Sequence, residues 1–155
     1  MQSLIAPVEQ FAYREKTKAT VSATAGSTVQ ITVENNQGFS ANDYVVLKTP
    51  GNDQSHIAKI SSVSANNKIT VDTLKHNLYA GDEITKILFN KMKFYGRTAT
   101  GTYTEMTLDG SPKDIEVDNP NGTLFEYTGT EGYVYFKVTY YNSTTAEETD
   151  ITESN

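Results

Sequence analysis

The sequence predicts an all-β protein. Its apolar residues gather in short runs rich in Val, Ile, Thr, Tyr and Phe, and clusters of Gly, Asn, Asp, Ser and Pro separate these runs. Helical periodicity is scarce along the chain. With 155 residues, the protein is long enough to bury a core in one domain or in two small ones. We expect two units, a small N-terminal β-barrel or sandwich followed by a truncated β-sandwich.

The first segment, residues 1–16, is either a short helix or an extended arm. Its apolar residues fall at helix-like spacing and Pro7 suits a first helical turn, yet the same residues would also serve an extended arm. Exposed apolar groups must dock on something, so we expect this segment to reach onto a neighbouring subunit while the domain folds without it. The side chains expected at this interface are Leu4, Ile5, Val8, Phe11 and Tyr13.

Residues 17–90 are predicted to form the first β unit, a small barrel or sandwich. Turn-forming residues separate its strands, as in the run Pro50-Gly51-Asn52-Asp53. The strands that we expect lie at 20–23, 29–33, 43–49, 56–63, 68–74 and 82–89.

Two stretches of this unit echo one another, "FSANDYV" at 39–45 and "LYAGDEI" at 78–84. Each places a small turn-forming residue, Asn or Gly, directly before an aspartate. Asn and Gly tolerate a left-handed backbone, and the aspartate can hydrogen-bond the turn's amides. We therefore interpret Asp43, Gly81 and Asp82 as structural turn residues rather than as part of a catalytic pair of acids.

Residues 91–146 are predicted to form the second β unit. Residues 147–155 form an acidic tail, which we expect to be either a loose edge strand or disordered. A strong turn cluster, Asn119-Pro120-Asn121-Gly122, interrupts this unit. Strand-like stretches lie at 91–98, 101–108, 113–118, 124–128 and 132–145.

The stretch "GYVYFKVTYYNSTT", residues 132–145, is the densest run of β-branched and aromatic residues. Three clustered tyrosines on one strand face predict a contact surface, because tyrosine supplies a large contact area and keeps a hydroxyl for a partner. A preference of tyrosine for a half-solvated strand face would also account for them. In an extended chain, Val134, Phe136, Val138 and Tyr140 would face one side, and Tyr133, Tyr135 and Tyr141 the other.

The stretch "VYFKVTYYN" (134–142) resembles the F strand of fibronectin type III domains, and "FYGR" (94–97) resembles their central C strand. Only about 65 residues follow position 90, against roughly 100 in a full sandwich of this type. The resemblance therefore implies a shortened fibronectin type III-like unit. Its strands equivalent to A and B would be missing or supplied by the first unit.

The whole chain resembles a group of tailed-bacteriophage virion structural proteins, which pair an N-terminal β unit with a shortened fibronectin-like end. The likeness rests on residues 43–74, 88–104 and 135–145. It implies a capsid, neck or tail component located in the virion, without enzymatic activity. Its partners would be the major capsid, neck or tail proteins and further copies of this chain.

Charge and composition argue against several other classes of protein and of site. Residues 91–155 carry the whole formal charge of −6, with 5 Lys and Arg against 11 Asp and Glu, whereas residues 1–90 balance at 8 and 8. We find no basic patch for nucleic acid and no stretch long enough to span a membrane. The start of the chain does not read as a signal peptide. Without cysteine, disulfides, thiolate nucleophiles and Cys-ligated zinc are excluded.

The residues that could carry chemistry do not form a recognisable motif. His56 and His76 are the only histidines, and neither has a catalytic or metal-ligating partner at local spacing. The acidic run at 109–122 lacks the ordered ligand positions of a calcium loop. We expect no catalytic residue, no metal and no cofactor. The expected function is that of a capsid decoration or head–tail neck protein. The alternatives are a tail or baseplate protein and a carbohydrate- or surface-binding β-sandwich.

Overall fold

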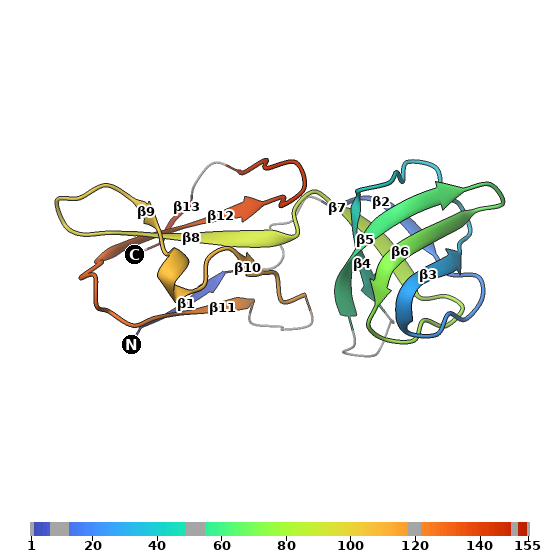
Figure 1. The fold of residues 1–155 in the computed structure, drawn as a ribbon, viewed down its shortest axis with the longest axis horizontal. Helices are drawn as coiled ribbons and strands as arrows, with labels where there is room; N and C mark the ends of the chain where they lie inside the picture. Colours follow the sequence, from blue (N-terminus) through green and yellow to red (C-terminus); the bar gives the residue numbers. More distant parts are fainter. Residues whose placement is uncertain (1, 7–12, 49–54, 118–121, 150–151, 155) are drawn as a thin grey trace. The chain divides into compact units, whose positions relative to one another are not determined.

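The computed structural model describes residues 2–6, 13–48, 55–117, 122–149 and 152–154 (Figure 1). The all-β prediction is confirmed, since strands make up 54% of the structure and form several antiparallel sheets. The chain divides into two compact units. The central unit contains residues 11–88, and the terminal unit combines residues 1–10 with residues 89–155.

This division differs from the expected one of 1–16, 17–90, 91–146 and 147–155 at its beginning. Gln2–Ala6 do not form a separate arm but pair with β11 (Thr123–Tyr127), in the same unit as the last part of the chain. The acidic tail contributes a short strand to that unit as well. Both ends of the central unit therefore continue into the terminal unit.

The central unit contains one six-stranded antiparallel sheet with the order β2-β7-β4-β5-β6-β3. A bulge in β5, between the pairs of Ile60 and Ser62, interrupts its ladder with β6. The strands are β2 (Tyr13–Lys18), β3 (Gly26–Thr32), β4 (Tyr44–Lys48), β5 (Ser55–Ser64), β6 (Lys68–Leu74) and β7 (Glu83–Ile87).

Backbone hydrogen bonds join the chain next to the first and last strands of this sheet. Thr20 N–H donates to the Thr32 carbonyl at 2.9 Å, and Glu34 N–H donates to the Lys18 carbonyl at 2.9 Å. One apolar cluster receives side chains from strands across the whole sheet, so the inward faces share a single core. It comprises Ala19, Ile31, Val33, Phe39, Val45, Leu47, Ala58, Ile60, Ile69, Val71, Leu74, Leu78 and Ile84.

The two repeated turns of the central unit have the same hydrogen bonding. Asp43 Oδ2 accepts the N–H of Ser40 at 2.8 Å, and Asp82 Oδ2 accepts the N–H of Tyr79 at 2.9 Å. The residue before each aspartate has a left-handed backbone, with φ +74° at Asn42 and +96° at Gly81. Each aspartate thus closes the turn that leads into a strand, β4 or β7.

Replacing Asp82 with Ala is expected to destabilise the central unit by about 1–3 kcal/mol, because the turn N–H of Tyr79 loses the buried Asp82 carboxylate as its acceptor. Asp82→Asn is the matched control, since the amide oxygen can still accept this bond. Chemical denaturation of the two variants measures the difference. An equal loss for Ala and Asn would contradict the turn role and assign the effect to the lost charge.

The terminal unit is a sandwich of a two-stranded sheet, β1-β11, and a second sheet with the order β10-β8-β12-β13, with β9 also paired to β8 (Figure 1). A single 3₁₀ turn, η1 (Thr107–Asp109), follows β9. The strands are β1 (Gln2–Ala6), β8 (Lys91–Arg97), β9 (Thr104–Glu105), β10 (Lys113–Asp114), β11 (Thr123–Tyr127), β12 (Tyr135–Tyr141) and β13 (Thr152–Ser154).

Aromatic side chains fill the space between the two sheets. The rings of Phe94 on β8 and Phe125 on β11 stack with centroids 4.2 Å apart, and Tyr127 meets Phe136 edge to face at 5.6 Å. Leu4 of β1 is buried in the same unit, 7% exposed. The sandwich core therefore includes the start of the chain.

The helical alternative for the N-terminus is wrong for Gln2–Ala6, which form an antiparallel strand from Gln2 opposite Tyr127 to Ala6 opposite Thr123. Two expected strands also differ. Residues 20–23 form no strand. Val21 in this stretch is 53% exposed, so the stretch does not bury an apolar side as a core strand would. The expected strand at 101–108 shortens to Thr104–Glu105, because the chain turns into η1 directly afterwards.

Candidate interaction face

The outer face of the larger terminal sheet presents alternating aromatic and basic side chains from β8 and β12. Because neighbouring residues of a strand point to opposite sides, Met92, Phe94 and Gly96 face the core, and the residues between them face outward. The antiparallel register places tyrosine beside a cation at three positions along this face. The pairs are Tyr135 with Arg97, Tyr95 with Lys137, and Tyr141 with Lys91.

The cations lie over the tyrosine rings. Lys93 Nζ is 4.0 Å from the centroid of the Tyr141 ring, and the Arg97 guanidinium carbon is 4.2 Å from that of Tyr135. Tyr103, from the loop before β9, lies under Lys137 Nζ at 4.0 Å. Each such contact contributes about 0.5–1 kcal/mol at an exposed site, so the rings are held in place by their own chain. The tyrosine–cation face is the set Lys93, Tyr95, Arg97, Tyr103, Tyr135, Lys137 and Tyr141.

One margin of this face is closed by Glu148, which forms an isolated bridge with Tyr141. Glu148 Oε1 accepts hydrogen bonds from the Tyr95 hydroxyl and, at 2.5 Å, from Thr139 Oγ1. Lys93 Nζ lies 3.9 Å from the second oxygen of the same carboxylate. Thr139 is fully buried although it points outward, so this part of the face is covered within the chain.

Two phenols of the terminal unit hold their protons more tightly than an exposed tyrosine. Burial, followed by the hydrogen bond to Glu148, raises the pKa of Tyr95 above the ordinary value of 10.0. Burial, followed by the charge of Glu131, raises the pKa of Tyr133 as well. In both cases the neutral phenol is the form that fits the folded unit.

The terminal unit is expected to lose stability as the pH rises above about 10, the pKa of an unfolded tyrosine. Above that pH the folded state binds more protons than the unfolded state, so the free energy of unfolding falls, whereas below it the contribution is fully present. Denaturation at neutral pH and at about pH 11 measures this slope. Tyr95→Phe should make it shallower, and Tyr79→Phe in the central unit is the matched loss of a phenol. An unchanged slope in Tyr95→Phe would contradict the assignment.

The structure brings together only some of the residues expected at an interface. Tyr135 is 39% exposed, and Tyr141 is half-buried on the same face. Leu4 is buried within its own unit rather than available to a neighbour. Ile5 and Tyr13 lie in β1 and β2, while Val8 and Phe11 lie outside the described residues.

Tyr133 does not lie on the outer face. It precedes β12, and its ring stacks on Tyr127 in the core layer with centroids 5.5 Å apart. The ring packs over Gly96, and the Tyr133 N–H donates to the Tyr127 hydroxyl at 2.9 Å. Val134, expected in the core, is 54% exposed instead. The alternation of β12 therefore begins only at Tyr135.

Sequence reasoning missed the basic half of this face. Arg97 and Lys137 contribute to it as much as the tyrosines do, and Tyr103, which the sequence pattern did not single out either, lies under both cations. The alternation in "KMKFYGR" (91–97) was the available signal, because it places Lys, Tyr and Arg on one side of a strand whose other side is apolar.

The other candidate residues have structural surroundings. His56 and His76 meet edge to face at 5.4 Å, and His56 Nε2 accepts the N–H of Lys75 at 3.1 Å. In the acidic run, Asp114 pairs with Lys91 at 2.6 Å and Glu116 with Lys113 at 3.0 Å. Among the residues that the structure describes, no three potential metal ligands gather, and no helix is long and apolar enough to cross a membrane.

No protein-family model matches this chain, and neither the search of curated proteins nor the search of solved structures finds a match.

Proposed function

We propose that this protein is a non-enzymatic virion structural protein that acts through contacts between many copies of proteins. The tyrosine–cation face is the observation that carries the proposal. Its rings are held by cations on two paired strands, so little side-chain freedom is lost when a partner covers them. Tyrosine and arginine are also the residue types enriched in protein interfaces.

The strand arrangement supports the more detailed parts of the fold prediction, a fibronectin type III-like sandwich and a small barrel. β8 and β12, which resemble the C and F strands of fibronectin type III domains, are antiparallel neighbours, as those strands are. β1 pairs with β11 in the smaller sheet of the sandwich and so supplies a first-sheet strand that the shortened second unit was expected to lack. For the central unit, the bonds beside β2 and β3 support a small barrel.

Within the virion we favour a capsid decoration protein or a component of the head–tail neck, followed by the tail or baseplate. This preference rests on the sequence resemblance alone. The partners would be the major capsid, neck or tail proteins and other copies of this chain.

Carbohydrate binding is the rival function, since exposed tyrosines can stack on sugar rings. The geometry makes the face less suited to it, because Arg97 covers one side of the Tyr135 ring and Lys137 one side of the Tyr103 ring. A sugar could stack only on the opposite sides. Glycan-array binding that is lost in Tyr135→Ala would favour this rival.

The test is the amount of the chain in purified virions, measured by quantitative mass spectrometry. We expect many copies per particle, and a loss of about tenfold or more when Tyr103 and Tyr135 are both changed to Ala. Tyr79→Ala is the matched control, because Tyr79 is an exposed tyrosine, 54% exposed, in the central unit. Absence of the wild-type chain from virions would overturn the proposed function. Unchanged incorporation of the double variant would overturn only the role of the face.

A further inference from the structure

The second edge of β11 is open. β11 forms a two-stranded sheet with β1, and no other described strand pairs with it. Unpaired strand edges present rows of backbone donors and acceptors that can pair with another chain. This edge lies in the terminal unit, away from the face formed by β8 and β12.

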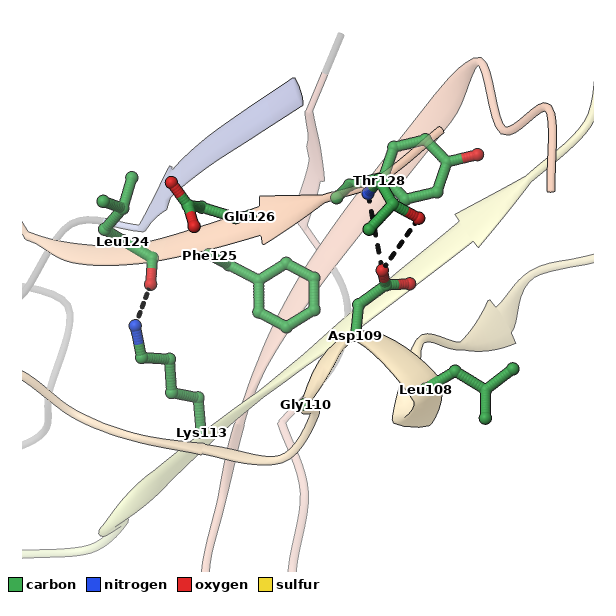
Figure 2. Close-up of a pocket in the computed structure, with 9 residues that line it drawn as sticks. Leu108, Asp109, Gly110, Lys113, Leu124, Phe125, Glu126 and Thr128 are labelled. Atoms are coloured by element: carbon green, nitrogen blue, oxygen red, sulfur yellow. Dashed lines mark hydrogen bonds between the residues drawn. The ribbon is translucent and has the colours of Figure 1, made fainter. Parts of the chain in front are cut away.

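The hydrogen-bond partners of the β11 backbone show in which direction its N–H and C=O groups point. The Leu124 carbonyl accepts a hydrogen bond from Lys113 Nζ, and the Thr128 N–H donates to Asp109 Oδ1 at 3.4 Å (Figure 2). Both partners lie on the side away from β1. Because alternate residues of an antiparallel strand bond to the same neighbour, Leu124 and Glu126 present their N–H and C=O groups to the open edge.

A groove of about 540 Å³ runs along this edge. Figure 2 shows the Phe125 ring between Lys113 at one end and Asp109 at the other. At the lip of the groove, Leu108 is 92% exposed, the most exposed large apolar side chain of the described residues. The groove thus combines backbone groups that no described strand pairs with and apolar surface that a paired strand would cover.

We propose that β11 pairs with β11 of a second copy of this chain, antiparallel about a two-fold axis at Phe125. This register places Leu124 opposite Glu126 of the partner subunit, and the same pair repeats across the axis. Leu124 and Glu126 are the two residues whose backbone groups face outward, so each pair exchanges two backbone hydrogen bonds.

Charge complementarity favours a second copy as the occupant. The exposed side chain of Glu126 in one copy comes beside Lys113 of the other, whose Nζ already lies at the Leu124 carbonyl. Lys113 also pairs with Glu116 of its own chain at 3.0 Å, so the new carboxylate joins an existing ion pair. One patch supplies both the acid and the base, which is what a two-fold contact requires. Asp109 lies beyond the paired residues, beside Thr128.

The test is sedimentation equilibrium of the full chain over a range of concentrations. Wild type is expected to dimerise, and Glu126→Pro, which removes an N–H from the open edge only, is expected to weaken the dimer by about tenfold or more. Ser3→Pro is the matched control, because Ser3 lies opposite Glu126 and faces the other edge of the same sheet. A variant is interpreted only when its circular dichroism matches that of wild type.

Charge reversal provides the second arm, which avoids proline. Glu126→Lys should weaken the dimer by placing two cations together, and adding Lys113→Glu should restore it. A wild-type chain that stays monomeric overturns the proposal, as does a dimer that Ser3→Pro weakens as much as Glu126→Pro. A dimer that is lost in Tyr135→Ala and unaffected by Glu126→Lys also overturns it, since the tyrosine–cation face would then hold the copies together. The proposed virion function does not depend on any of these outcomes.

Discussion

Deleting residues 1–10 is expected to unfold the terminal unit and to leave the central unit folded. The deletion removes β1, the only described strand that pairs with β11, and with it the buried side chain of Leu4. Without β1, the two-stranded sheet is lost, and the buried side chains of Phe125 and Tyr127 become exposed to water. An isolated β-strand has no independent stability in water.

The expected loss in the free energy of unfolding is large enough for the terminal unit to unfold completely rather than to be weakened in part. Truncating one buried leucine to alanine already costs about 2–5 kcal/mol. The whole stability of a small domain is about 5–15 kcal/mol, and the deletion removes a strand's backbone hydrogen bonds in addition to the leucine. The central unit begins after the deleted residues and has its own apolar cluster, so its sheet is expected to persist.

Amide hydrogen exchange measures this outcome residue by residue. In the deleted chain, β8 and β12 should exchange rapidly while β5 and β6 stay protected. Leu4→Ala should weaken the terminal unit in the same direction, and Ser3→Ala, an exposed neighbour on β1, is its matched control. Full protection of β8 and β12 after the deletion would restore the alternative in which this segment is an arm for a neighbouring subunit.

The N-terminal segment shows why part of the fold could not be predicted. Apolar residues at helix-like spacing describe the segment locally, but the partner of Leu4 is Phe125, far away in the sequence. Strand pairing at that separation leaves no local signal. By contrast, the two aspartate turns and strands such as β6 depend on neighbouring residues, and the sequence pattern predicts them well.

The tyrosine–cation face was predictable to a similar extent. Alternation placed Tyr135 and Tyr141 on one side of β12 correctly, because both lie within the regular strand. It failed for Tyr133, because Gly96 on the neighbouring strand leaves a space that the ring fills from the core side. Tyr103 reaches the face from a loop, and no strand period could have placed it there.

Gly96→Ala is expected to destabilise the terminal unit by about 2–4 kcal/mol. A Cβ at this position would lie 2.4 Å from Tyr133 Cδ2 and 2.6 Å from Cγ, closer than non-bonded carbon atoms can approach. These atoms belong to the base of the ring, so a small rotation at its far end cannot relieve the clash. Tyr133 must leave its site, and it then loses the stacking on Tyr127 and the hydrogen bond from its N–H to the Tyr127 hydroxyl.

Two companion variants separate this clash from the general effect of replacing a strand glycine. Gly26→Ala in β3 should be close to neutral, because the nearest atom to its new Cβ is Val29 Cγ2 at an ordinary 3.7 Å. Combined with Tyr133→Ala, Gly96→Ala should cost much less than it does alone, since the ring that it displaces is gone. Denaturation of wild type, Gly96→Ala, Tyr133→Ala and the double variant completes a double-mutant cycle. Additive losses would show that Tyr133 does not occupy the space over Gly96, and the tyrosine could then belong to the outer face after all.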